Sequence, residues 1–146
     1  LQVIKGTGLS NNRMTVVNNV RSAGDWISRD GLMAKTAATS SGTFPPWPLC
    51  SSPSSGTFPL TLTWQEFNGV AYLATHTVVY TYSSADKTIT RNFDGATVTI
   101  AQNIASTPTV TVCSGTLTVM ITATAGSDTQ QSSEVRTYII SLRRSL

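Results

Sequence analysis

The sequence has little charge. Asp, Glu, Lys and Arg make up 12% of its 146 residues, where soluble domains usually have roughly 25%. The net charge is only +3, and Arg143-Arg144 is the one adjacent basic pair. Because nucleic-acid binding requires clustered cations, we expect no nucleic-acid partner. Hydrophobic residues at 40% and a low net charge argue against disorder, so we predict one folded domain, residues 1–146.

The sequence also lacks an apolar run long enough to span a bilayer, and it starts with neither a signal-peptide core nor Met. We interpret the chain as a processed or shortened product. Its two cysteines, Cys50 and Cys113, lack the spacing of a zinc site. A disulfide between them is the leading interpretation and implies an oxidising compartment. Two free buried thiols are the alternative.

Catalytic and metal-binding residues are scarce. His76 is the only histidine, and no serine lies in a nucleophile elbow. We interpret His76 as a packed strand residue bonded to a hydroxyl. Asp94 and Asp128 fall in predicted turns, where Asp is favoured for backbone reasons, and neither lies in a calcium-binding motif. We therefore predict a protein without catalytic activity, metal or cofactor.

An amphipathic helix is predicted within residues 1–38. At 100° per residue, its small and apolar residues fall within an arc of about 80° and form a seam: Val16, Val20, Ala23, Ile27, Gly31 and Ala34. Short side chains in this seam allow a sheet to approach closely. At its edge, Trp26 is predicted to seal the boundary between helix and sheet. Asp30 is predicted to bind loop amides or pair with an arginine, and a subunit contact is the alternative for both residues.

Residues 39–59 are rich in Ser, Gly and Pro, which predicts one long loop. Phe44 and Trp47 flank prolines within it. They form either a lid over the core or an exposed platform for a sugar or partner protein.

Residues 60–146 alternate between apolar and hydroxyl-bearing side chains, as half-buried antiparallel strands do. We predict strands near 60–67, 72–83, 87–93, 96–104, 109–113, 116–125 and 134–143. The expected fold is α+β, with the N-terminal amphipathic helix packed on a single antiparallel meander. A β-sandwich with a helical appendage is the rival architecture.

Several of these segments carry a family likeness. Residues 17–34 resemble the distal half of the long N-terminal helix of type IV pilin-like proteins. The likeness is strongest to minor pilins and the J-class minor pseudopilins of type II secretion, where an Ile-Ser-Arg-Asp turn, here Ile27-Ser28-Arg29-Asp30, closes that helix. Leu62-Thr63-Trp64, Val78–Tyr82 and Ile89-Thr90-Arg91-Asn92 are similar to the strand, strand and L-x-R pattern of that group. Residues 119–124 and 141–144 also fit.

The resemblance implies a pilin-like fold and a structural subunit of a type IV pilus or type II secretion pseudopilus. It implies other pilin or pseudopilin subunits as partners and an extracytoplasmic location. The chain lacks the family's prepilin cleavage motif and apolar N-terminal half-helix, and contact with a membrane is expected only through that missing segment. The alternative function is an extracellular carbohydrate- or protein-binding β module that uses Phe44 and Trp47.

Overall fold

The computed structural model describes residues 2–39, 42–44 and 53–142. It begins with helix α1, Gln2–Met33, and continues with strands and one short 3₁₀ helix, η1. The bounds are β1 Thr36–Thr39, β2 Gly42–Phe44, β3 Ser54–Thr57, β4 Leu60–Phe67, β5 Tyr72–Ser83, β6 Thr88–Phe93, β7 Ala96–Ala101, β8 Thr109–Cys113, β9 Thr116–Ala125, η1 Asp128–Gln130 and β10 Ser132–Ser141.

The predicted helix is too long at its C-terminal end. Helix α1 stops at Met33, and the amide of Lys35 donates a hydrogen bond to the carbonyl of Thr63 at 2.9 Å. From there the chain pairs with β4, with Ala37 opposite Leu62. Residues 36–38 therefore belong to β1, because their backbone groups bond to a neighbouring strand instead of to the preceding helical turn.

The prediction of one long loop is also wrong for its described residues. Strand β2 pairs with β1, and β3 pairs with β8. Both lie at the edge of a sheet, where one side of the strand needs no partner. Small residues such as Ser54 and Gly56 can form an edge strand. The Ser, Gly and Pro residues of 39–59 therefore predicted a loop where the chain forms two short strands.

The prediction of a helix packed on a single meander sheet is wrong as well. The strands form two antiparallel sheets, ordered β2-β1-β4-β5-β6-β7 and β10-β9-β8-β3, in a β-sandwich-like arrangement. The division falls after β7, where Ile104 forms an isolated bridge with Ala123 of β9 and takes the chain into the second sheet. The strand predicted to run to residue 104 ends instead at Ala101 in β7, and residues 102–108 connect the two sheets. Their alternating neighbours do not reveal that the two sides belong to different sheets.

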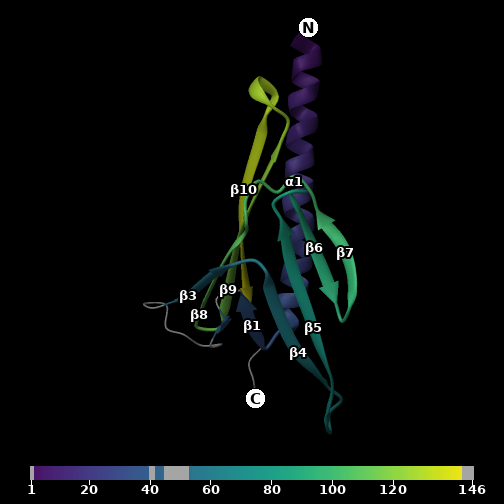
Figure 1. The fold of residues 1–146 in the computed structure, drawn as a ribbon, viewed down its shortest axis with the longest axis vertical. Helices are drawn as coiled ribbons and strands as arrows, with labels where there is room; N and C mark the ends of the chain where they lie inside the picture. The colour runs from purple at the N-terminus through teal and green to yellow at the C-terminus, as the bar shows by residue number, and fades with distance from the viewer. Residues whose placement is uncertain (1, 40–41, 45–52, 143–146) are drawn as a thin grey trace.

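The core lies between the two sheets and α1. Helix α1 contacts β9 and β10 of the second sheet and β7 at the edge of the first. Figure 1 shows it between β10 on one side and β7 on the other, with its N-terminal turns extending beyond the ends of the strands. The inner faces contribute fully buried side chains, among them Leu60, Leu62, Val78 and Ile89 from the first sheet and Val110, Val112, Leu117, Val119 and Ile121 from the second.

Candidate functional site

The buried face of α1 packs against strands of both sheets. All six predicted seam residues are buried. A Cβ atom on Gly31 would lie 2.7 Å from Cγ2 of Ile140 on β10. The contact is closer at Gly24, which is not among the predicted seam residues, because a Cβ atom added there would lie 1.9 Å from Cζ of Tyr138. Strand β10 therefore approaches the helix at positions where only glycine fits. In the sequence, the glycine directly after Ala23 could have indicated this close approach.

Polar side chains fasten the helix to both sheets. From the second sheet, the Tyr138 hydroxyl donates a hydrogen bond to the Val20 carbonyl at 2.8 Å. The ring of the same tyrosine packs against Gly24. On the side of β7, the Ser22 hydroxyl donates to the Ile100 carbonyl at 2.6 Å, and Asn19 Oδ1 accepts from the Gln102 amide at 2.7 Å. These bonds limit both sliding and rotation of the helix, because they hold two of its sides.

A buried charge cluster lies near the C-terminal end of α1. Asp30 is only 4% exposed and is the buried charged residue among those the structure describes. Arg91 of β6 binds it bidentately, with Nε to Oδ2 at 2.7 Å and an Nη to Oδ1 at 2.9 Å. The Tyr80 hydroxyl of β5 also donates to Oδ2. The predicted pairing of Asp30 with an arginine is therefore confirmed.

Aromatic rings enclose the guanidinium of this cluster. The Cζ atom of Arg91 lies 4.5 Å from the ring centroid of Trp26 and 5.1 Å from that of Phe93. The hydrogen bonds to Asp30 raise the pKa of Arg91. Burial, assisted by the bond to Asp30, raises the pKa of Tyr80 far above its ordinary value. Tyr80 therefore stays neutral and Arg91 charged at physiological pH, and the cluster acts as a fixed connection between helix and sheet.

His76 lies in a second, more exposed cluster. Its Nδ1 is 2.6 Å from Asp94 Oδ2, which accepts a hydrogen bond from it, while Nε2 lies 3.1 Å from a Glu66 oxygen without hydrogen-bond geometry. The ring stacks on Phe93, with centroids 5.5 Å apart, and is tilted against Trp64. The hydroxyl partner predicted for His76 is wrong, because its neighbours are carboxylates.

The electrostatics of this second cluster are mutual. Hydrogen bonding to Asp94 raises the pKa of His76 against the opposing effect of burial, and the same bond lowers the pKa of Asp94. The Thr77 amide also donates to Asp94 at 2.8 Å and adds to that lowering. The Nδ1 atom of His76 is therefore engaged by Asp94, and the bond fixes the orientation of the ring against Phe93.

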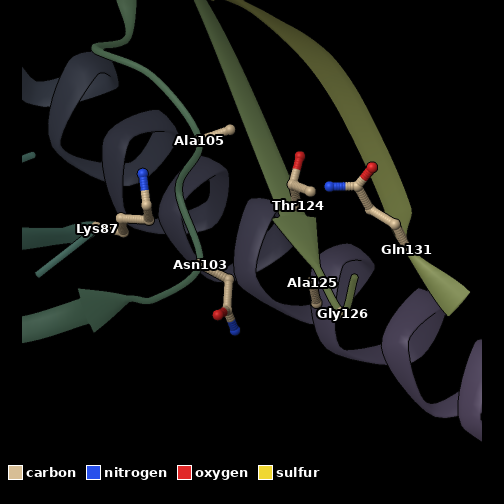
Figure 2. A pocket seen from close by; sticks show the side chains of 7 residues that line it. All are labelled: Lys87, Asn103, Ala105, Thr124, Ala125, Gly126 and Gln131. Carbon is tan, nitrogen blue, oxygen red and sulfur yellow. The ribbon is translucent and has the colours of Figure 1, made fainter. Parts of the chain in front are cut away.

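A cavity of about 480 Å³ with both polar and apolar lining opens where the chain passes between the sheets. Figure 2 shows its lining, which comes from the turn before β6, the connection after β7, the end of β9 with the residue that follows it, and the segment before β10: Lys87, Asn103, Ala105, Thr124, Ala125, Gly126 and Gln131. Lys87 is the one charged residue among these seven. The Thr124 hydroxyl already bonds to that of Ser133 at 2.6 Å.

Several predicted site residues lie outside the described residues or only partly within them. Cys113 is disulfide-bonded at the end of β8, whereas Cys50, its predicted partner, is outside the described residues. Trp47 is also outside them, and the backbone of Phe44 ends β2. Asp128 begins η1, and Asp94 is bonded to His76.

Comparisons with known proteins yield no match to a family model, to a curated protein or to a solved structure. Among the described residues, no group of three or more His, Cys, Asp and Glu side chains has the arrangement of a metal site. In the same part of the chain, no helix is both long and apolar enough to cross a membrane.

Proposed function

We propose that this chain is a structural subunit of a type IV pilus or type II secretion pseudopilus, where it serves filament assembly as a minor pilin or minor pseudopilin. The observation that carries the proposal is the division of α1. Its distal part, from about Val16 to Gly31, is built into the body by the seam. Its first turns extend past the strands (Figure 1), which leaves the backbone of this end outside the body and suits it to pack with helices of other subunits.

The length of α1 supports this division. A helix of 32 residues is about 48 Å long at 1.5 Å per residue. Contacts with the body from Asn12, whose Nδ2 donates to the Gln130 carbonyl at 2.7 Å, to the buried Gly31 occupy about 30 Å of that length. A helix that served only the core of this domain would not need the remaining turns, whereas one that also packs in a filament would.

The buried charge cluster supports the family resemblance. The Ile-Ser-Arg-Asp turn and the Ile-Thr-Arg segment each contribute one charged residue, Asp30 and Arg91, and these are 61 positions apart. Their bidentate ion pair gives the two motifs one shared structural role, which is to fix the end of the helix against the sheet. The resemblance therefore rests on the helix and its attachment, since the two-sheet body differs from the single sheet that it implied.

The proposed role is not catalytic. Asp30 uses both of its carboxylate oxygens in the cluster, and His76 contacts two carboxylates and two aromatic rings instead of a hydroxyl or thiol. Such groups hold elements together. The binding-module alternative depends on Trp47, which is outside the described residues, so no contact in the structure favours it.

The gene and the native filament provide the test. We expect the coding sequence upstream of Leu1 to encode a basic leader and then about 20 apolar residues with an acid near their start. A photoreactive residue at Met14, 60% exposed on α1, should crosslink to filament subunits. The matched control is Val98, 51% exposed on β7, where we expect little crosslinking to those subunits.

Two results would refute the filament role. One is an upstream sequence without the apolar segment. The other is a deletion strain that assembles filaments and secretes normally, because a subunit that serves assembly must lower filament number when it is absent.

A further inference from the structure

The tip of the β4–β5 hairpin is an exposed apolar surface. Four large hydrophobic residues occur within seven positions and are open to solvent: Phe67 at 51%, Val70 at 89%, Tyr72 at 51% and Leu73 at 47%. No charged residue occurs from Phe67 to Thr75. Monomeric soluble proteins rarely leave such clusters uncovered without an interaction to serve.

The apolar side chains surround this tip instead of covering one face. Phe67 is paired with Tyr72 across the hairpin, and their ring centroids are 5.1 Å apart. Leu73 follows Tyr72 directly in β5, so the two side chains point to opposite faces, yet both are exposed. A protein surface usually covers one side of a hairpin, whereas an apolar medium covers a tip from all sides.

The turn at the tip satisfies its own backbone. Asn68 Oδ1 accepts hydrogen bonds from the amides of Val70 and Ala71, each at 2.9 Å. The Asn68 amide donates to the Ala71 carbonyl at 3.2 Å. Unpaired backbone amides are costly in an apolar environment, and these local bonds lower the cost of taking the turn out of water.

A cation flanks the aromatic residues of the tip. Lys35 Nζ lies 4.3 Å from the ring centroid of Tyr72. The nearest acid in the sequence is Glu66, and its carboxylate lies 3.1 Å from His76 Nε2. Aromatic rings together with a neighbouring lysine are typical of segments that lie at the boundary between lipid headgroups and acyl chains.

We propose that the tip, residues 67–73, docks into the interfacial layer of an anionic phospholipid bilayer, with Lys35 at the level of the phosphates. The segment lies in the surface of the bilayer and does not cross it. Figure 1 shows this hairpin at the end of the molecule opposite the N-terminus, so the contact differs from the membrane attachment expected through the missing N-terminal segment. It is also independent of the filament role, and either proposal can fail without the other.

Vesicle flotation of the 146-residue chain tests the proposal. We expect the protein to float with vesicles of equal parts phosphatidylglycerol and phosphatidylcholine, and several-fold less with phosphatidylcholine alone. The double variant Val70→Asp/Leu73→Asp should lower binding roughly tenfold or more, because two apolar anchors are lost. The matched control, Val98→Asp, changes an exposed apolar residue of β7 and should leave binding unchanged.

Lys35→Gln should weaken binding to the anionic vesicles only. Circular dichroism of each variant establishes that the fold is retained. The proposal is overturned if the wild-type chain floats with neither vesicle, if the double variant floats as well as wild type, or if Val98→Asp loses as much binding. Equal binding to both vesicle types overturns the proposed preference for an anionic bilayer. Self-association that depends on the tip, without flotation, assigns the surface to a protein contact instead and also overturns the proposal.

Discussion

Removing one member of the buried ion pair should destabilise the fold strongly. Arg91→Met leaves the Asp30 carboxylate, 4% exposed, with the Tyr80 hydroxyl but without its counter-ion. An uncompensated buried charge of this kind costs about 3–5 kcal/mol. Asp30→Ala leaves the Arg91 guanidinium between Trp26 and Phe93 without its carboxylate, and we expect a smaller loss because that side chain reaches nearer to solvent.

The double variant separates the pair from its surroundings. Asp30→Ala/Arg91→Met removes both charges, so its loss should be about 1–3 kcal/mol smaller than the sum of the two single losses. The free energy of unfolding is measured in urea and followed by tryptophan fluorescence and circular dichroism. Arg136→Met is the control, because Arg136 also pairs with a carboxylate, that of Glu134 at 3.0 Å, but nearer the surface. It should leave the midpoint almost unchanged.

The reasoning is refuted if the losses from Asp30→Ala and Arg91→Met add within about 0.5 kcal/mol. It is also refuted if Arg91→Met costs no more than Arg136→Met. Either outcome would mean that water or a rearranged side chain replaces the missing partner. The cluster would then not be the fixed connection between helix and sheet that its geometry indicates.

Three further predictions concern packing, pH and the disulfide. Gly24→Ala should lower stability by about 1–3 kcal/mol through overpacking against Tyr138. In a Tyr138→Ala background the same change should stabilise by up to about 1 kcal/mol, as alanine does in an open helix, and urea unfolding of the four proteins checks the reversal. Asp94 raises the pKa of His76 above 6.5 in the folded state. The contribution of the His76–Asp94 pair to folding stability is therefore complete below pH 6.5 and is lost as pH rises through the raised pKa. His76→Gln should therefore lower the melting temperature more at pH 6 than at pH 9, and equal losses at both would contradict the ion pair. Cys113→Ser should cost about 4 kcal/mol if its partner closes a loop of roughly sixty residues, and non-reducing peptide mapping identifies that partner.

The strands were predictable because alternation is a local property. The bounds of β4, β5, β8 and β9 are those that the alternation predicts. The assignment of strands to sheets was not predictable, because it depends on what the chain does between strands. The Ala105 amide donates to the Thr122 carbonyl and the Thr124 amide to the Asn103 carbonyl, and these two bonds direct residues 102–108 to the other sheet. Nothing in the local pattern distinguishes this connection from a hairpin turn.

The clusters were predictable only in part, for a similar reason. The helical period places Asp30 at the edge of the seam and indicates a polar partner. Which arginine reaches it is decided by the order of β5 and β6 beside the helix. The carboxylates around His76 depend on the same long-range pairing, since Asp94 lies in the β6–β7 turn and Glu66 in β4. The hairpin tip had a visible signal, an uncharged apolar run across a turn, but only exposure distinguishes such a run from core.

The Asp30–Arg91 pair makes most sense as a device that sets the position of the helix. The hydrophobic seam stabilises the packing, but burial of apolar surface has no direction. A bidentate ion pair is directional, and it is satisfied at one position of α1 relative to β6. Replacing both charges with apolar residues can preserve stability while removing this constraint. In the filament subunit that we propose, the angle between helix and body determines where each body lies on the filament surface, so the pair would be retained for geometry even where its net stability is small.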